Sequence, residues 1–272
     1  MLNLPNRVSL IGAVVALQGI ACGEPIFNGR SLDGWHIMQM PSDDPYHATE
    51  DNFFVEDGAI VCAQTEQRKG GLLLTDATFI DFELKLEMKS DWGCDSGVFI
   101  RCTNKGQGIQ IMNDYLPGGN VGGLYGQGTG GYLSRPIQLA EGTESGSVLA
   151  RNSYDGVEID GLVYFIDADG WNELWKASEW NTLRIRCVGA EPRITTWVND
   201  VKVMEMDGRV CRARHLEDVN NANWDAKPAW DQELIQSITG NAGRIGLQIH
   251  PGNRWKAGGT VRYRSIVLTP IK

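Results

Sequence analysis

Short runs of alternating apolar and polar residues recur along most of the chain after its first two dozen residues. The clearest is FIDFELKLEMKS, in which Phe82, Leu84, Leu86 and Met88 alternate with charged residues. A period of two places the apolar side chains on one face of a β-strand. Four later segments repeat the pattern: TLRIRCVG, RITTWVNDVKVMEM, GRIGLQIH and GTVRYRSIVLTPI. The pattern predicts an all-β protein whose strands bury one face each.

Turn signals separate these strands and leave little room for helices. Asp57-Gly58 in NFFVEDGAIVCA and Asn199-Asp200 in RITTWVNDVKVMEM predict two-residue hairpin turns, because these residue types accept the left-handed backbone of a tight hairpin. One segment, AWDQELIQSITG, predicts a short helix that ends near Gly240. Together these elements predict a β-sandwich.

Composition fits one globular domain. The 272 residues are 42% hydrophobic and 22% charged, which is enough to bury a large core. The 25 basic and 34 acidic residues give a formal net charge of -9, and no phosphate-neutralising surface is evident. We therefore expect no nucleic-acid partner.

The N-terminus has the pattern of an export signal. Arg7 precedes an apolar run from Leu10 to Gly23, which is too short for a comfortable membrane span, and small residues stand just before Glu24. We expect cleavage there, so that residues 1–23 form a signal peptide and residues 24–272 one mature domain. Lipoprotein anchoring through Cys22 is the less favoured alternative, because Gly19 stands where a large aliphatic residue is expected.

Export predicts a periplasmic or extracellular protein with no stable membrane span after signal cleavage. The intact mass of native protein should correspond to a chain that begins near Glu24. A cytoplasmic species that retains Met1 would contradict export.

The mature chain has an odd number of cysteines and no C-x-x-C pair: Cys62, Cys94, Cys102, Cys187 and Cys211. A zinc site is therefore not expected. Cys94 and Cys102 flank one predicted strand, which would hold them too far apart for a disulfide. We expect buried free thiols.

Polar residues interrupt the two strands predicted in DSGVFIRCTNKGQGIQIMNDY, residues 95–115. If these strands line the concave face of a sandwich, then Arg101, Gln110, Asn113 and Asp114 face a ligand. Such hydrogen-bonding groups suit a polar ligand, so we assign Gln110 and Asn113 to substrate binding.

The glycine-rich segment LPGGNVGGLYGQGTGGYLSRP predicts a loop. A flexible linker is the simplest interpretation of such glycine density. Tyr125 and Tyr132 within the segment, with Tyr115 just before it, argue instead for a loop that packs over a ligand cleft. Tyr125 is therefore a candidate for substrate binding.

These motifs occur in the order seen in a known family. From about Pro25 to its end, the chain resembles the secreted 3-keto-disaccharide hydrolases, also described as 3-keto-glucoside lyase/hydratase domains. The motifs are IFNGRSLDGW, FFVEDGAIVC, DFELKLEMK, DSGVFIR, GLYG, SEWNTLRIRCVG, RITTWVNDVKV, GRIGLQIHPG and VRYRSIVLTPI. None is specific alone, but their order covers most of the mature chain. The resemblance implies a concanavalin A-like jelly-roll β-sandwich, in agreement with the strand pattern.

The resemblance also implies an exported enzyme that cleaves or hydrates 3-keto-glycosides. A ketone at C3 makes the C2 proton acidic, so a base removes it, the C1 substituent leaves by β-elimination, and water then hydrates the glucal. The route needs a base near C2, a donor at the enolate oxygen and an acid at the leaving oxygen. Ordinary glycoside hydrolysis needs a carboxylate pair across the bond instead.

His250 is the best acid or base that the sequence offers. It ends GRIGLQIH at a predicted strand-to-loop junction, where catalytic groups are common, and imidazole exchanges protons near neutral pH. GLQIH matches the family's G-L-Q-x-H pattern, which makes His250 a catalytic candidate and Gln248 a substrate-binding one. Without that context, a lone histidine is more often structural.

Arg101 has two interpretations. It is a candidate ligand of the enolate or of a hydroxyl, in a catalytic set with His250 and Asp114. Alternatively, it pairs with Glu83 or Glu87 on a neighbouring strand, since a buried charge needs a partner.

The chain departs from the family where members commonly show E-x-Q-I-x-D. It has GIQIMND, with Gly108 for the glutamate and Asn113 for the aspartate. Either Asp114 or another group substitutes for the missing acid, or the domain has lost the chemistry and binds a glycan without cleaving it.

An inserted segment contains DADG, from Asp167 to Gly170, which is similar to the start of a calcium loop. The later ligands of such a loop are not in place, so we expect a solvated turn. No cofactor is assigned, and a divalent metal such as calcium stays a candidate without named ligands.

Overall fold

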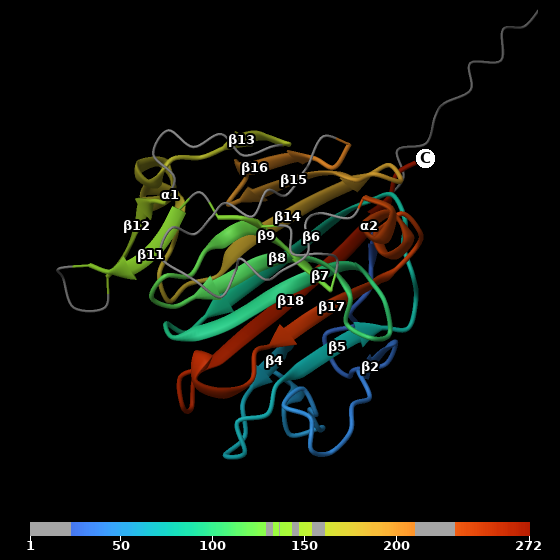
Figure 1. Ribbon diagram of the computed structural model, residues 1–272. Helices are drawn as coiled ribbons and strands as arrows, with labels where there is room; N and C mark the ends of the chain where they lie inside the picture. Colours follow the sequence, from blue (N-terminus) through green and yellow to red (C-terminus); the bar gives the residue numbers. More distant parts are fainter. Residues whose placement is uncertain (1–22, 129–132, 136, 143–146, 154–160, 210–231) are drawn as a thin grey trace, which may run out of the picture.

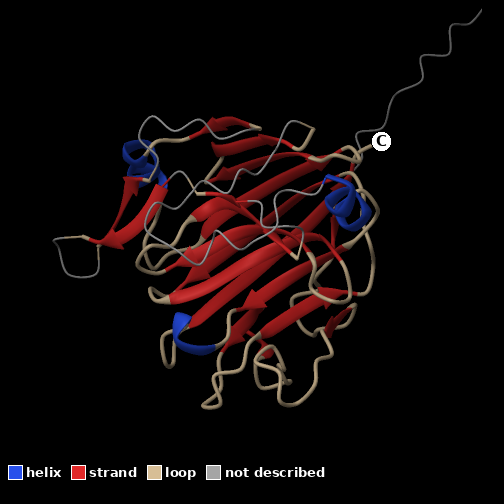
Figure 2. Ribbon diagram, viewed as in Figure 1, coloured by secondary structure: helices blue, strands red, loops and turns tan. Residues whose placement is uncertain are grey.

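The structure is a computed structural model that describes residues 23–128, 133–135, 137–142, 147–153, 161–209 and 232–272. Two large antiparallel sheets form a sandwich (Figures 1 and 2). The predicted jelly-roll β-sandwich is confirmed. The expected signal peptide up to residue 22, Tyr132 and Cys211 lie outside the described residues.

The nine-stranded sheet has the order β13-β16-β15-β14-β6-β18-β4-β3, with β1 paired to β18. Its strands are β1 (Glu24–Pro25), β3 (Phe53–Glu56), β4 (Ala59–Ala63), β6 (Phe82–Ser90), β13 (Leu162–Phe165), β14 (Asn181–Val188), β15 (Arg193–Val198), β16 (Val201–Asp207) and β18 (Thr260–Pro270).

The seven-stranded sheet has the order β10-β9-β8-β7-β17-β5-β2, and Figure 1 shows β7, β17 and β5 side by side. Its strands are β2 (Trp35–Ile37), β5 (Gly71–Thr75), β7 (Cys94–Cys102), β8 (Gly108–Tyr115), β9 (Val121–Gln127), β10 (Leu133–Ser134) and β17 (Arg244–Ile249). The remaining elements are β11 (Ile137–Glu141) paired with β12 (Val148–Asn152), α1 (Ala168–Leu174), α2 (Gln232–Thr239) and the short 3₁₀ helix η1 (Gly252–Arg254).

The core lies between the two large sheets and follows the alternation read from the sequence. On β6, Leu84, Leu86 and Met88 are fully buried, whereas the residues between them reach solvent. Val98 and Ile111 contribute from the seven-stranded sheet to the same cluster. Each such side chain contributes about 1.5–3 kcal/mol by leaving water, so the sandwich is stabilised mainly by this shared layer.

Both predicted hairpin turns are confirmed. Asp57 and Gly58 join β3 to β4 with φ of 49° and 75°, and Asn199 and Asp200 join β15 to β16 with φ of 49° and 65°. Positive φ at both central residues matches the right-handed twist of the flanking strands. The predicted short helix is α2, which ends at Thr239.

The glycine-rich segment is not a loop throughout, because most of its first half forms strand β9. Its glycines allow close packing: a Cβ atom on Gly122 would lie 2.8 Å from Val203 Cγ1, and one on Gly123 would lie 2.5 Å from the Ser134 carbonyl oxygen. At Gly122 and Gly123, glycine therefore permits contact between neighbouring chain segments rather than flexibility.

The DADG segment starts a helix, so the expected solvated turn is wrong. Asp167 is the N-cap of α1, and its side chain accepts a hydrogen bond of 2.8 Å from the backbone N–H of Gly170. Aspartate is preferred at this position because it satisfies an otherwise unpaired N–H of the first turn.

The expectation of buried free thiols is confirmed for Cys62, Cys94, Cys102 and Cys187. Burial raises the pKa of Cys94, Cys102 and Cys187 to about 12. Because the thiolate is the reactive form, these cysteines are inert packing residues.

Candidate functional site

Three polar residues lie in one row across the seven-stranded sheet. Asp95 on β7 is the cross-strand partner of Asp114 on β8, and the backbone N–H of His250 donates to the Asp95 carbonyl oxygen at 3.1 Å. Ser96 and Asn113, the next residues along β7 and β8, point toward the other sheet. Since successive side chains alternate, Asp95 and Asp114 point to the outward face.

Asp95 and Asp114 form a carboxyl pair that shares a proton. The pKa of Asp114 is raised well above its usual range, first by burial and then by the charge of Asp95 and the hydrogen bond between the two. The guanidinium of Arg254 forms an ion pair with Asp95 through Nε. The negative charge of the pair therefore resides on Asp95, and Asp114 keeps its proton to a higher pH than an ordinary aspartate does.

A protonated Asp114 makes a testable link between pH and stability. Because the pKa of Asp114 is higher in the folded state, its protonated form stabilises the fold. This stabilisation is complete below the pKa of the unfolded state, near 3.9, and is lost as the pH rises through the pKa of the folded state. Asp114→Asn cannot ionise and keeps a donor for Asp95. We expect the unfolding free energy of the wild type to fall relative to this variant as pH rises, by about 1.4 kcal/mol per unit of pKa elevation.

Denaturant titrations between about pH 4 and pH 9 measure this difference. The control is Asp43→Asn, because Asp43 is exposed. If Asp114→Asn and Asp43→Asn both follow the wild type across the range, Asp114 is not held protonated.

His250 is oriented by its neighbours at the end of β17. Its Nδ1 lies 2.8 Å from the Pro251 carbonyl oxygen, and because a carbonyl only accepts, Nδ1 carries the hydrogen. The neutral ring therefore keeps the lone pair of Nε2 for a proton. The Tyr46 ring meets the imidazole edge-on at 6.2 Å between centroids, and Gln64 donates to the His250 carbonyl oxygen at 2.7 Å. These contacts favour His250 as a positioned base.

Gln110 and Gln248 form a second polar row beside the first. Gln110 Nε2 donates to Gln248 Oε1 at 2.9 Å, and a Cβ atom on Gly97 would lie 2.3 Å from that nitrogen. Glycine at position 97 therefore makes room for the two amides. Tyr125 on β9 is the cross-strand partner of Gln110 and is half-buried. The structure thus places five of the candidate residues on or beside one sheet: His250, Asp114, Gln110, Gln248 and Tyr125.

Three residues that sequence reasoning missed complete this group: Tyr46, Asp95 and Arg254. Burial, followed by the charge of Asp95, raises the pKa of Tyr46, so its hydroxyl stays a hydrogen-bond donor. Asp95 could have been found from the sequence of the β7–β8 hairpin. If the turn is placed at residues 103–106, counting residues outward along both strands pairs Asp95 with Asp114. Tyr46 and Arg254 lie outside the strands and leave no comparable signal.

Arg101 does not belong to this group, because it lies near the other end of β7. Its side chain is fully buried, and Nη2 donates to Asp81 Oδ1 at 2.8 Å. Nε and Nη1 donate to the carbonyl oxygens of Ile80, Gly189 and Thr239 at 2.9, 2.6 and 2.8 Å. Of the two interpretations, the structure supports the ion pair, with Asp81 in place of either predicted glutamate.

A β-bulge explains why simple alternation misplaces Arg101. Its φ is 48°, and the pairing of β7 with β17 shifts between Cys102 opposite Arg244 and Phe99 opposite Gly246. The extra residue in β7 puts Cys102 and Phe99 in one apolar cluster apart from the main core. Arg101 is thereby turned away from the face that carries Asp95.

Asn113 does not face the candidate site, contrary to its predicted role in substrate binding. Its Nδ2 donates to Ser90 Oγ at 2.9 Å and to the Tyr263 hydroxyl at 3.2 Å, between the sheets. Asn113 and Asp114 cannot share a face because they are adjacent in one strand. Gly108 has no room for the family's glutamate, since a Cβ atom would lie 2.9 Å from Cys102 Cα.

Within the described ranges, no cluster of three or more His, Cys, Asp or Glu side chains is arranged to hold a metal ion. The divalent metal considered from the sequence stays a prediction. No helix in the described part of the chain is long and apolar enough to cross a membrane.

The sandwich and its polar row define a carbohydrate-active type of β-sandwich protein. More specifically, the chain belongs to the family of 3-keto-alpha-glucoside-1,2-lyase-like domains, whose sequence model matches residues 23–269. The resemblance drawn from the motifs is therefore confirmed.

Solved structures show the same fold at low sequence identity. The chain is similar to the crystal structure of a "Putative glycosyl hydrolase" from Parabacteroides distasonis, with 20% identity, 92% of this chain and 100% of the other covered, and a TM-score of 0.51. It is also similar to the catalytic domain of PdAgaC, with 11% identity, coverage of 91% and 89%, and a TM-score of 0.50. No match was found among curated proteins. At these identities the likeness establishes the fold alone.

Proposed function

We propose that this protein cleaves or hydrates 3-keto-glycosides by β-elimination on the outward face of the seven-stranded sheet, after export from the cytoplasm. The observation that carries the proposal is the row in which His250 and a protonated Asp114 flank Asp95. Such a row supplies a base and an acid side by side, as an elimination requires.

Each step of the proposed reaction has a residue to perform it. His250 Nε2 takes the C2 proton, and the C2–H electrons form the enolate of the C3 ketone. The enolate then collapses to a C1=C2 double bond as the C1–O bond breaks, and Asp114 gives its proton to the departing oxygen. The proton on His250 and the charge on Asp114 are reset through solvent. Water that adds across the double bond completes the hydration.

The spacing of the row suits one sugar ring. Neighbouring strands lie about 4.8 Å apart, so the backbones of His250 and Asp114 are roughly 10 Å apart across β7. Donors for the enolate oxygen are the Tyr46 hydroxyl and the Arg254 guanidinium, which take the role that sequence reasoning gave to Arg101.

The carboxyl pair does not suit ordinary glycoside hydrolysis. That reaction places two carboxyl groups about 5–5.5 Å apart with retention and about 6.5–9.5 Å apart with inversion, so that the sugar lies between them. Asp95 and Asp114 are hydrogen-bonded to each other. No glycosidic bond fits between them, which favours a route that uses only one as an acid.

The test is incubation of the purified chain with an aryl 3-keto-glucoside and with the unoxidised aryl glucoside. Release of the aryl alcohol and appearance of the glucal from the ketone alone would support elimination. Release from the unoxidised glucoside at an equal rate would show ordinary hydrolysis and overturn the proposal.

The second candidate function is binding of a glycan without cleavage, and it rests on Gly108. The missing glutamate removes one acid that the family commonly carries, and the tight contact with β7 excludes its simple restoration. Calorimetric binding of the intact ketone with no product after prolonged incubation would favour this function.

A further inference from the structure

A second polar hollow lies on the outward face of the nine-stranded sheet. Thr195 on β15 has Arg186 on β14 and Glu205 on β16 as its cross-strand partners. Arg193 and Trp197 lie two residues away on either side of Thr195, so they share its face. Because a small residue stands among long ones, the surface is hollowed to a cavity of about 410 Å³.

We call this cavity the outer pocket and define it by six of its lining residues: Arg186, Arg193, Thr195, Trp197, Lys202 and Glu205. It lies on a different sheet from His250 and Asp114. Its volume is within the range of small-ligand sites and is sufficient for one or two sugar residues.

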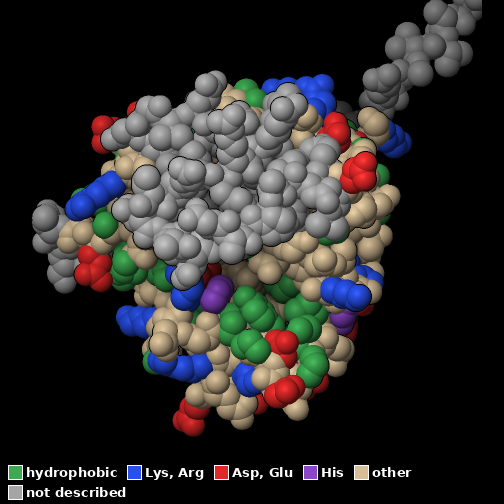
Figure 3. Space-filling model, in the orientation of Figure 1, with side chains coloured by type: hydrophobic (Ala, Val, Ile, Leu, Met, Phe, Trp, Pro, Cys, Tyr) green, Lys and Arg blue, Asp and Glu red, His purple; other side chains and the backbone are tan. Residues whose placement is uncertain are grey.

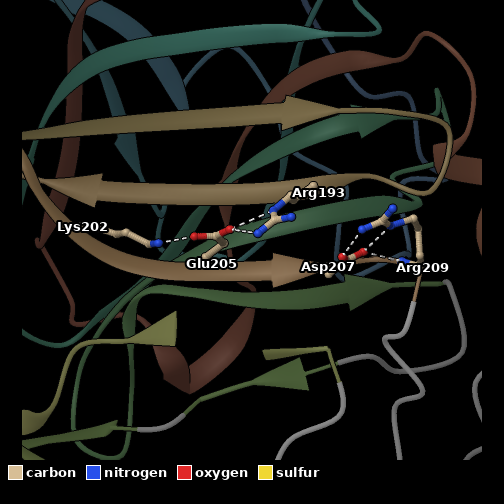
Figure 4. Close-up of polar contacts among 5 residues, drawn as sticks. All are labelled: Arg193, Lys202, Glu205, Asp207 and Arg209. Carbon is tan, nitrogen blue, oxygen red and sulfur yellow. Dashed lines mark hydrogen bonds and ion pairs between the residues drawn. The ribbon is translucent and has the colours of Figure 1, made fainter. Parts of the chain in front are cut away.

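Ion pairs hold the rim of the outer pocket in place. Arg193 Nε donates to Glu205 Oε1 at 2.8 Å, and Lys202 Nζ contacts the other carboxylate oxygen. Figure 4 shows Arg193 and Lys202 approaching Glu205 from opposite sides. One carboxylate thus binds two cations, and the group keeps a positive charge.

Arg186 adds a cation whose guanidinium has no hydrogen bond or ion pair with any other residue that the structure describes. Glu83 lies opposite it across the strands, but that carboxylate accepts from Arg184 at 3.2 Å. The Thr195 hydroxyl likewise has no partner within the described ranges. This face therefore carries hydrogen-bond donors that a ligand can use, although the whole chain carries a net charge of -9.

Trp197 supplies an aromatic wall beside these donors. The Arg184 guanidinium stacks 3.6 Å from the centroid of its ring, which fixes the indole on the sheet. An aromatic surface next to a guanidinium that pairs with no described residue is suited to a molecule with one apolar face and one negative group.

We propose that the outer pocket binds an acidic sugar residue of the uronic acid class. Its carboxylate accepts from the fork of Arg186 and from the Thr195 hydroxyl, and its ring lies against Trp197. A planar guanidinium binds a carboxylate through two parallel hydrogen bonds, so recognition is specific for the acid as well as for its charge.

Calorimetric titration with a tetrasaccharide of β-1,4-linked glucuronic acid tests the proposal, with cellotetraose as the neutral analogue. We expect the wild-type chain to bind the acidic tetrasaccharide, with an affinity that falls as salt is added, and not to bind cellotetraose. Arg186→Ala should weaken binding about 10-fold or more, and Thr195→Val should weaken it less.

The matched control is Arg262→Ala on β18, which removes an arginine from the nine-stranded sheet outside the pocket, where it pairs with Glu56. It should bind as the wild type does. Unchanged melting temperatures show that all three variants are folded. The proposal is overturned if the wild type does not bind, if cellotetraose binds equally, if inorganic sulfate competes as strongly as the tetrasaccharide, or if Arg186→Ala matches Arg262→Ala.

Discussion

Replacing His250 with alanine should lower turnover of an aryl 3-keto-glucoside by roughly 10²- to 10⁴-fold and leave the fold intact. In the proposed reaction the imidazole takes the C2 proton, and the preceding strand β17 is fixed by backbone hydrogen bonds that the substitution does not touch. The rate of aryl alcohol release at saturating substrate measures the effect.

The matched control is His36→Ala, because His36 lies on edge strand β2 in an exposed pair with Asp76. It should keep the wild-type rate. A His250→Ala protein with an undiminished rate would remove histidine from the mechanism.

The acid is tested by Asp114→Asn in the same assay. Wild-type activity should fall as pH rises through the elevated pKa of Asp114, because only the protonated form donates to the leaving oxygen. The amide cannot give up a proton, so the variant should be slow at every pH and lack this decline.

Replacing Arg101 with leucine should lower the free energy of unfolding by about 3–5 kcal/mol. The substitution leaves three carbonyl oxygens without their donor, together with the Asp81 carboxylate. Arg101→Lys should recover little of the loss, since one ammonium cannot reach groups arranged around a planar fork. Denaturant titration measures both variants.

Arg262→Leu is the comparison, because its pair with Glu56 is exposed to solvent and should cost about 1 kcal/mol or less. If Arg101→Leu were no less stable than Arg262→Leu but had lost activity, Arg101 would be functional after all and the site would need to be redrawn.

The local pattern of residues was sufficient to predict the fold. The alternation on β6 and the hairpins at Asp57-Gly58 and Asn199-Asp200 appear in the structure as the sequence indicates, because strand period and turn conformation depend on neighbouring residues only. The strand that directly precedes His250 was also predicted, since its alternation is clear. The glycine-rich segment was predicted to be a loop because glycine occurs both in flexible loops and in strands that pack closely. Only the contact of β9 with Val203 distinguishes the two cases.

The composition of the site was decided by tertiary structure. The alternation of side chains along a strand predicts that Asn113 and Asp114 point to opposite faces of the sheet. Only the pairing with β7 and the contacts of Asn113 with Ser90 and Tyr263 show that Asp114 is the one that faces outward. Arg101 was misplaced because a β-bulge breaks the period of two without a local signal.

Tyr46 and Arg254 show the limit of sequence reasoning most clearly. They come from a loop and from the 3₁₀ helix η1, far apart in the chain, and meet beside Asp95. The electrostatic effects between these groups exist only after folding. The sequence by itself determined the strands, their turns and a histidine at the end of one strand. The sheet pairing and loop packing decided which polar groups share a face, because side chains distant in sequence become neighbours only through long-range contacts.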